Sequence, residues 1–461
     1  MNRTKAQATM VSRRQFLHGA AAIAGTALVA ACVPPTAAPS GAPQSSAPVI
    51  SDKPLAGTTI NVLAPRITFT DATQSQLAKL EEATGITAKF DVFAEKEAQQ
   101  KIAVELAAGS NAYDVVWTGG NGVPQKASAG WLEPLDPFVE REDPDVLRLD
   151  DFLPPLLNSG RWDGKLYALP VFLGTQLFYY RKDIVDTPPD DFDSLMAAAQ
   201  EYHNNPLAAF AIRGARGADS ALWPFPIFML GFGGSWFKDY PADMHPTYDS
   251  PEAIRAAEYW VELLSNYGMP NVASAHFDEV LIAVSEGQAA MAIEGAPLAA
   301  RLFDPEQSKV HDKLGMTLVP SGPAGRFPPF SPHHWGMPAS APNKDAAWEF
   351  IKWALSEETQ LQGALSTNHI AVSRASVWEN PEFRQKYNYG GGETFVELFF
   401  QSAMQASELY RPPIPEWPQL GDRLSVALNE ALTGQKSAEQ AMLDAQEDLY
   451  QLFKDAGYYD S

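Results

Sequence analysis

Cysteine is almost absent from this sequence, because Cys32 is the only one among 461 residues. A single thiol forms no intramolecular disulfide, so the stability of the fold has to come from a large apolar core. Hydrophobic residues make up 45% of the chain, which is enough to fill one. Since one core rarely serves more than about 250–300 residues, we expect two domains.

Positive charge is also scarce. The chain carries 34 Lys and Arg against 56 Asp and Glu, a formal net charge of −22. An acidic surface repels phosphate groups and anionic lipids. This excludes a nucleic-acid partner and a polybasic membrane patch.

The usual sequence signatures of cofactor and catalytic sites are missing. The chain has no Gly-x-Gly-x-x-Gly, no phosphate loop, no Gly-x-Ser-x-Gly and no His-Glu-x-x-His. His333 and His334 are neighbours without a third ligand at zinc spacing. We therefore expect no cofactor and no metal. A glycoside hydrolase stays open as an alternative, because it needs only two carboxylates about 5–10 Å apart.

No apolar run reaches the about 20 residues that span a bilayer, and the stretch at residues 18 to 31 is shorter. The paired Arg13 and Arg14 before this stretch resemble a twin-arginine export signal. The small residues before Cys32 resemble a lipoprotein cleavage box. We predict that residues 1–31 form a signal peptide, that Cys32 carries a lipid anchor, and that residues 32–54 are a flexible linker rich in Pro, Ala and Ser.

Strand and helix patterns alternate after the linker. A β-rich run at residues 58–63 precedes a helical pattern that opens at Asp71 and stops at Gly85, and residues 86–92 read as the next strand. A second helical run ends at Gly109, before a strand at residues 113–117. This order predicts a parallel α/β sheet. Later helices are expected after Ser250 and Asn343, which stand at N-cap positions.

Several segments occur in the order found in one known family. They are residues 113–117, 130–136, 163–170 with 178–182, 287–295, 346–353, and the terminal helices from Leu424. Together they resemble the extracellular solute-binding proteins of family 1, the sugar receptors of ABC importers of the maltose-binding-protein type. The resemblance covers nearly all of the chain after the linker and says little about which solute is bound.

The resemblance implies an α/β, two-lobed fold of the periplasmic-binding-protein type (type II) with three interlobe crossovers. Lobe I would hold residues 55–171 and 331–377, and lobe II residues 175–328 and 380–461. The crossovers would lie near residues 172–174, 328–330 and 377–379. Two segments depart from the family pattern: His334-Trp335-Gly336 replaces a frequent Gly-Gly, and Ala296-Pro297 replaces a frequent aromatic residue.

A sugar site combines aromatic faces with paired polar groups, because an unpaired buried polar group costs roughly 1–3 kcal/mol. From strand ends and from the resemblance, we predict these ligand-binding residues: Trp117, Thr118, Asn121, Thr175, Asp219, Trp223, Glu294, Trp335 and Trp417. Each has a structural alternative, such as a core position for Trp117, a hinge hydrogen bond for Thr175, a helix cap for Asp219 or packing against proline for Trp417. Arg374 is expected to form a structural salt bridge.

The resemblance implies a monomeric binding lipoprotein that captures a small solute by lobe closure and passes it to ABC permease subunits. A neutral carbohydrate is the predicted ligand, because the candidate positions are acidic, amide or aromatic. A polyamine would also suit those acids and remains the alternative. A structural lipoprotein, which has no closing cleft, is a third class.

Overall fold

The computed structural model describes residues 53–119, 122–204, 206–390 and 394–459. The predicted export signal at Arg13 and Arg14, the lipidation site at Cys32 and the candidate ligand residue Asn121 lie outside these ranges. Among the described helices, none is both long and apolar enough to cross a membrane.

Lobe I is built on a five-stranded sheet with the order β2-β1-β3-β13-β6. Its strands are β1 (Thr59–Pro65), β2 (Thr87–Phe93), β3 (Val115–Gly119), β6 (Ala168–Gly174) and β13 (Ser331–Gly336). Strand β1 pairs in parallel with β2 and with β3, which confirms the predicted parallel arrangement. Strand β13 pairs antiparallel with β3 and β6 and so completes the sheet with a segment from far along the chain.

The first helical pattern forms two helices where we expected one. They are α1 (Thr68–Gln74) and α2 (Leu77–Thr84). The break falls at Ser75 and Gln76. The side chains of these two residues form hydrogen bonds with each other and with Ser366. Gly85, at φ 74°, ends α2 in the left-handed conformation that glycine adopts without strain.

Further helices and short strands surround this sheet. They are α3 (Glu95–Ala107), α4 (Gly122–Ser128), α5 (Asp136–Val139), α6 (Pro144–Leu147), η1 (Leu149–Asp151), α7 (Pro154–Ser159), β4 (Arg161–Trp162), β5 (Lys165–Leu166), α13 (Lys344–Ala354), α14 (Glu357–Ser366), α15 (Ala375–Glu379) and α16 (Pro381–Lys386). Helix α13 begins after Asn343 as predicted, although the Asn343 side chain makes no capping bond.

Lobe II is built on a four-stranded sheet with the order β12-β7-β11-β8. Its strands are β7 (Gln176–Arg181), β8 (Ala208–Ala211), β11 (Ala289–Gly295) and β12 (Leu314–Thr317), with a separate hairpin of β9 (Phe237–Asp239) and β10 (Asp243–Pro246). Its helices are α8 (Phe192–Tyr202), α9 (Phe225–Gly231), α10 (Pro251–Tyr267), η2 (Val272–Ser274), α11 (Phe277–Ser285), η3 (Ala296–Leu298), α12 (Ala299–Leu302), α17 (Thr394–Gln405), η4 (Glu408–Tyr410), α18 (Trp417–Leu432) and α19 (Ala438–Asp455). The Ser250 hydroxyl accepts from the Ala253 N–H and caps α10, which confirms the predicted start of this helix.

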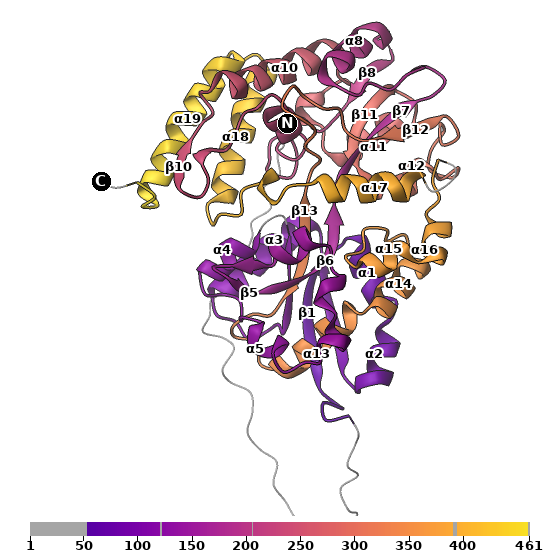
Figure 1. Cartoon of the computed structure of the whole chain (residues 1–461), viewed down its shortest axis with the longest axis vertical. Coiled ribbons are helices and arrows are strands. Elements are labelled where there is room, and N and C mark those ends of the chain that lie inside the picture. The colour runs from indigo at the N-terminus through magenta and orange to yellow at the C-terminus, as the bar shows by residue number, and fades with distance from the viewer. Residues whose placement is uncertain (1–52, 120–121, 205, 391–393, 460–461) are drawn as a thin grey trace, which may run out of the picture. The chain divides into compact units, whose positions relative to one another are not determined.

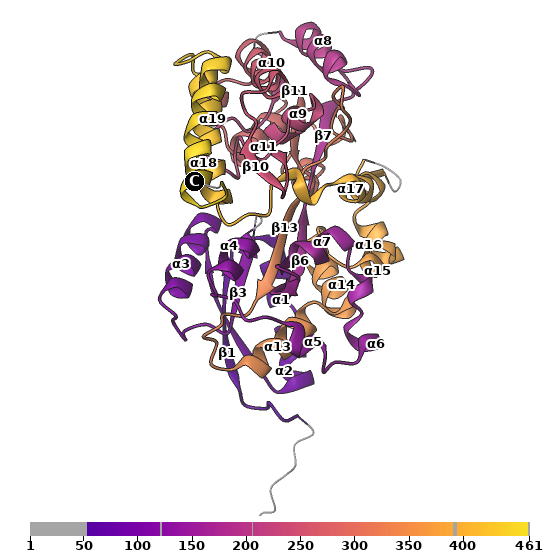
Figure 2. The same ribbon diagram turned by 60° about the vertical axis from the view of Figure 1, so that its left-hand side comes forward.

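The two sheets are joined directly by strands (Figures 1 and 2). Strand β6 of lobe I ends at Gly174 and β7 of lobe II begins at Gln176, so Thr175 alone separates them. The Thr175 hydroxyl lies 2.6 Å from the hydroxyl of Ser402 on α17. Helix α16 contacts α14 of lobe I, whereas α17 contacts β7. The third crossover therefore follows Lys386, later than the predicted residues 377–379.

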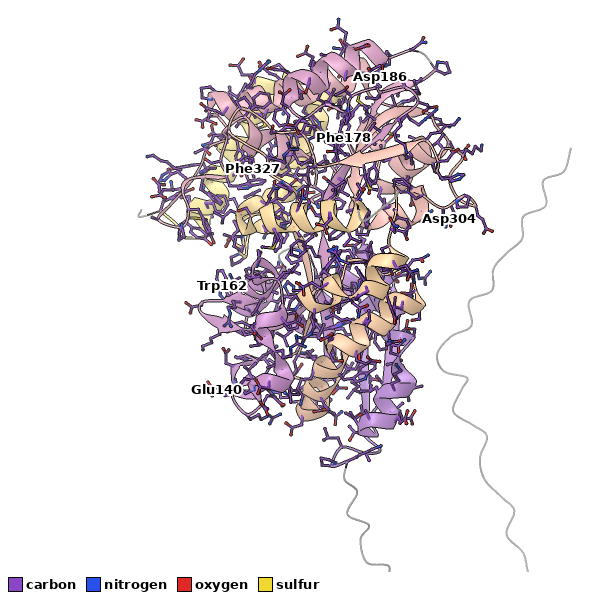
Figure 3. All side chains as sticks on the ribbon, turned by 45° about the vertical axis from the view of Figure 1, so that its right-hand side comes forward. Glu140, Trp162, Phe178, Asp186, Asp304 and Phe327 are labelled. Atoms are coloured by element: carbon purple, nitrogen blue, oxygen red, sulfur yellow. The ribbon has the colours of Figure 1, made fainter. Side chains whose placement is uncertain are left out.

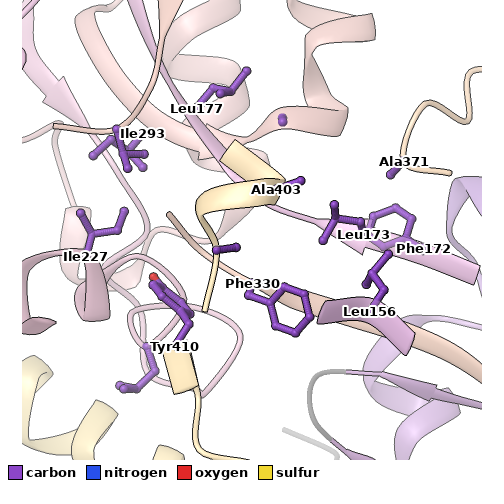
Figure 4. Packing of buried hydrophobic residues seen from close by; sticks show 14 of the residues in the cluster. Leu156, Phe172, Leu173, Leu177, Ile227, Ile293, Phe330, Ala371, Ala403 and Tyr410 are labelled. Atoms are coloured by element: carbon purple, nitrogen blue, oxygen red, sulfur yellow. The ribbon is translucent and has the colours of Figure 1, made fainter. Parts of the chain in front are cut away.

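Buried apolar side chains continue along the crossing segments from one lobe to the other. Phe172 and Leu173 on β6, Leu177 on β7, Phe330 before β13 and Ala403 on α17 belong to one cluster (Figure 4). The core therefore continues through the crossing segments, which also carry the buried polar residues Thr175, Gln176 and His333. Figure 3 contrasts a core and a surface position. Phe178 on β7 of lobe II is fully buried, and Glu140 of lobe I is exposed at the surface.

Candidate ligand-binding site

A cavity of about 690 Å³ lies between the carboxyl ends of strands from both lobes. Lobe I contributes Arg66, Ile67, Thr68, Asp71, Glu95, Phe172, Gly174, Ser331, His333, Thr367 and Asn368, and lobe II contributes Arg213, Asp219, Trp223, His276, Phe277, Gly295, Pro297, Leu298, Ala300, Arg301 and Gln307. Its volume is that of a site for a small organic molecule, roughly 300–1,000 Å³.

An arginine–carboxylate pair forms the lobe II wall of this cavity. Arg213 follows β8 and Glu294 lies on the parallel neighbour β11, so both reach the same edge of the sheet. Arg213 Nε donates to Glu294 Oε2 at 2.8 Å and Nη2 donates to Oε1 at 2.5 Å. The Gly295 N–H also donates to Oε1. Glu294 is 1% exposed and its charge is fully matched by Arg213.

Aromatic rings enclose the Arg213 guanidinium. Its central carbon lies 4.3 Å from the ring centre of Trp223 and 5.6 Å from that of Phe277. Trp223 approaches closely because Gly295 has no side chain: a Cβ there would stand 3.0 Å from the indole. Phe277 is 40% exposed and presents an apolar face to the cavity.

A second ion pair stands beside the first. Arg411 Nη1 donates to Asp219 Oδ1 at 2.8 Å, and Arg411 Nη2 donates to the Ala218 carbonyl at 2.8 Å. Withdrawal from bulk water raises the pKa of the Asp219 carboxyl, but the charge and hydrogen bond of Arg411 outweigh this and hold that pKa below its usual range. Asp219 is therefore an ionised acceptor at neutral pH.

His333 is a buried polar group on the lobe I side of the cavity. Its ring packs 4.6 Å from that of Phe172, and its Nδ1 accepts from the indole N–H of Trp117 at 3.1 Å. Burial lowers the pKa of His333 to about 3, against a smaller opposing effect of the Asp219 charge. The ring is therefore neutral at physiological pH.

Glu95, the first residue of α3, faces lobe II across the cavity. Its side chain stays exposed to the cavity, yet withdrawal from bulk water raises its pKa to about 7 and the negative charge of Asp219 adds to the rise. Arg213 and Arg411 oppose that rise. Electrostatic interactions across the cavity therefore couple Glu95 of lobe I to the charged groups of lobe II.

Two predicted ligand residues, Asp219 and Trp223, line the cavity. Two others lie one layer behind it: Glu294 behind Arg213, and Trp117 behind His333. Thr118 is buried in β3, and Thr175 is buried at the crossover against Ser402, the hinge bond that was its alternative.

The structure does not bring Trp335 and Trp417 to the cavity, contrary to the prediction. Trp335 is fully buried because it packs 5.3 Å from Phe69 in the core of lobe I. Trp417 starts α18, is 4% exposed and packs 5.5 Å from Trp236. They cannot sandwich a ligand ring.

Sequence reasoning missed Arg213, His333, Phe172 and Phe277. Arg213 follows a buried Ala-rich strand, and a polar residue at the carboxyl end of such a strand was a usable signal. The cavity also holds Arg66 and Arg301, so its lining carries three arginines against Asp71, Glu95 and Asp219. The predicted positions were acidic, amide or aromatic, whereas the lining as a whole is balanced in charge.

Chemically, the arrangement offers N–H donors, carboxylate acceptors and ring faces. Within the described ranges, no group of three or more His, Cys, Asp or Glu side chains is placed to hold a metal ion. Donors and acceptors of this kind suit the hydroxyl groups of a polar solute, and the rings suit its C–H surface.

Comparison with known proteins agrees with this geometry. The family profile described as bacterial extracellular solute-binding protein matches residues 67–361. The chain is 25% identical to a mannitol-binding protein of Pseudomonas aeruginosa, over 81% of this chain and 88% of that protein. It is 25% identical to an erythritol/L-threitol-binding protein of Mycolicibacterium smegmatis, over 83% of this chain and 84% of that protein.

The fold is also similar to solved structures. A solute-binding protein of Agrobacterium vitis S4 with bound D-mannitol superposes with a TM-score of 0.75 at 25% identity, over 87% of this chain and 100% of that chain. A maltose-bound protein of T. maritima superposes with a TM-score of 0.74 at 22% identity, over 86% of this chain and 100% of that chain, and supports the two-lobed fold alone.

Proposed function

This chain belongs to the bacterial extracellular solute-binding proteins, and from that premise we propose that it binds a neutral polyhydroxy solute, a sugar or sugar alcohol, and delivers it to an ABC permease. The family consists of binding proteins that act outside the cytoplasm. Relatives named for mannitol and for erythritol support the class of ligand.

The observation that carries the proposal is the pairing of charges at the cavity. Glu294 is matched by Arg213 and Asp219 by Arg411, so neither of these two carboxylates is left for a cationic ligand, and Arg66 and Arg301 balance the charges of Asp71 and Glu95 in the same lining. A polyamine would have to compete with buried guanidinium groups, which disfavours it. Neutral hydroxyl groups of a ligand can accept from Arg213 and donate to Asp219 without any change in the net charge of the site.

The test is calorimetric titration of the protein with D-mannitol, ribitol, maltose and spermidine at low and high salt. We expect at least one neutral compound to bind with nearly the same affinity at both salt concentrations, since screening acts on charge pairs. Binding of spermidine alone, weakened by salt, would replace this proposal with the polyamine alternative.

Catalysis is not part of the proposal. A glycoside hydrolase would use two carboxyl groups of different pKa, and Glu95 with Asp219 are the pair in this cavity that such an enzyme would need. Chromatography of the maltose incubation checks this directly. We expect intact maltose, and release of glucose would show that the protein is an enzyme.

Ligand binding is proposed to close the lobes, because the cavity has walls from both and closure lets both contact the solute. A ligand present at about 100 times its dissociation constant then adds roughly 2.7 kcal/mol to the unfolding free energy. Solution scattering with D-mannitol, or with whichever titrated compound binds, should give a smaller radius of gyration. An unchanged radius with bound ligand would rule out closure.

We also propose that Arg13 and Arg14 direct export, that Cys32 carries the lipid, and that the anchored protein is a monomer. The motif pair at the N-terminus supports the first two statements. Cys32→Ser should release the protein from membranes, and replacing both arginines by lysine should block export. A Cys32→Ser protein that stays in carbonate-washed membranes would contradict the anchor, and size-exclusion chromatography tests the monomer.

A further inference from the structure

His333 presents only one of its two ring nitrogens to the cavity. Nδ1 accepts the hydrogen bond from Trp117 Nε1 at 3.1 Å. Nε2 has no hydrogen-bond partner within the described part of the chain. It is also not fully buried, so it keeps some exposed surface. Since His333 lines the cavity, Nε2 is open to it.

The bond from Trp117 decides which nitrogen carries the proton. An indole N–H can only donate, so the nitrogen that it meets has to be the bare acceptor. A neutral imidazole has one N–H, which must then be on Nε2. Burial keeps the ring neutral, because it lowers the pKa of His333 to about 3, with Asp219 opposing and His334 and Arg411 adding to the shift.

Gly119 makes this contact possible. It lies opposite His333 in the β3–β13 pair, two residues from Trp117 on the same face of the sheet. A Cβ at Gly119 would stand 2.2 Å from Cζ2 of Trp117. The indole therefore lies across the glycine to reach His333, and any side chain at residue 119 would displace it.

We propose that Trp117 is a positioning residue that locks His333 in its Nε2–H form, so that His333 acts as a hydrogen-bond donor to a ligand hydroxyl in the cavity. This rests on the proposed function and adds a residue that determines specificity: the ligand must offer an acceptor oxygen at this point. Trp117 then acts on the ligand only through His333.

The decisive experiment measures the ring nitrogens of His333 in protein labelled with ¹⁵N-histidine. His333→Gln identifies the His333 signals by their loss. In the wild-type protein we expect a protonated Nε2, a bare Nδ1 and no titration between pH 8 and pH 5. A bare Nε2, or a ring that titrates in this range, would overturn the proposal.

Variants separate positioning from packing. Trp117→Phe removes the indole donor and Gly119→Ala displaces it while keeping the tryptophan, so both should mix the two neutral forms of His333. Trp378→Phe is the matched control, since it also removes a buried indole hydrogen bond, at 3.0 Å to the Val372 carbonyl, but leaves His333 untouched. An unchanged His333 signal in both Trp117→Phe and Gly119→Ala would contradict the lock.

Binding provides the second readout, with D-mannitol, ribitol and maltose as probes. His333→Phe should weaken binding about threefold to tenfold, as expected for one neutral hydrogen bond, while Trp378→Phe should not. If a probe binds the wild type and His333→Phe equally well, the donor role is wrong although the proposed function stands. If no probe binds the wild type, the proposed function fails, and the donor role fails with it.

Discussion

Each lobe contains a buried arginine–carboxylate pair, Arg374 with Asp151 in lobe I and Arg213 with Glu294 in lobe II, and the two pairs differ in what surrounds them. In lobe I, Arg374 bonds Asp151 at 3.2 Å and also donates to the carbonyls of Leu355, Arg148 and Leu147. It is 3% exposed and lies over the ring of Phe152. Its donors are taken up by the backbone, so it acts as a structural salt bridge, as predicted.

In lobe II, Arg213 does not use all of its N–H donors in intramolecular hydrogen bonds. An arginine has five N–H groups. Three of them serve Glu294 and the Asp219 carbonyl, which leaves two N–H groups for the proposed ligand. Burial and pairing alone therefore do not separate a structural ion pair from one that faces a ligand site. The two arginines differ in how many N–H groups remain without an intramolecular acceptor and in whether those groups face a cavity.

The largest expected effect tests the structural side of this comparison. Arg374→Ala removes the buried charged partner of Asp151 and leaves it the half-exposed Arg148 at 3.5 Å, so the unfolding free energy should fall by about 3 kcal/mol in a denaturant titration, the lower end of the range for breaking a buried pair. Arg141→Ala, which breaks an exposed pair with Asp345, should change it by less than about 1 kcal/mol. Equal effects of the two variants would show that burial of the pair does not matter here.

The next effect tests the binding side. Arg213→Lys keeps the charge but loses the two-pronged bond to Glu294 and the donors that face the cavity. Affinity for the polyol or sugar that binds the wild type should fall roughly 10- to 100-fold in calorimetry, as for a hydrogen bond to a charged group. Arg216→Lys is the control, because Arg216 bonds Asn429 outside the cavity. Unchanged affinity in Arg213→Lys would remove Arg213 from the site.

A smaller effect is expected from the ring against Arg213. Trp223→Ala should weaken binding about 10-fold, since aromatic contacts contribute about 0.5–1.5 kcal/mol beyond their area. Trp162→Ala, which alters an aromatic residue outside this cavity, should leave affinity unchanged. Glu294→Gln should act in the same direction as Trp223→Ala because it loosens Arg213. If neither Trp223→Ala nor Glu294→Gln changes binding, the ligand lies elsewhere.

The smallest effect concerns pH. The pKa of Glu95 rises from 4.5 to about 7 in the folded protein, so folding favours its protonated form. Its contribution is fully present below pH 4.5 and is lost as pH rises to about 7. The melting temperature of the wild type relative to Glu95→Gln should therefore decline across this window. An equal pH dependence of the melting temperature in the wild type and in Glu95→Gln would contradict this prediction.

Local patterns predicted strands β1, β2 and β3 and several helix ends, because these depend on nearby residues such as Gly85 and Ser250. The break between α1 and α2 was not predicted, and Ser366, which bonds the side chains of Ser75 and Gln76 there, is brought alongside them only by the tertiary fold. Local sequence also could not reveal the late third crossover, because α16 is held by its packing on α14.

The site was predicted less well for a related reason. Strand β13 places His333 and Trp335 on one face, and the sequence does not tell which of them reaches the cavity and which stays in the core. Glu294 was predicted as a ligand contact because its partner Arg213, 81 residues earlier, is not visible in a local pattern. Asp219 and Trp223 were found because they share a short segment that the family resemblance located.

The bond between the hydroxyls of Thr175 and Ser402 has a mechanical consequence. It joins the residue between β6 and β7 to helix α17, which follows the third crossover. Both partners are fully buried, so bulk water does not compete for the bond. The first and third connections between the lobes are therefore tied to each other, and in the proposed closure one cannot rotate without pulling on the other.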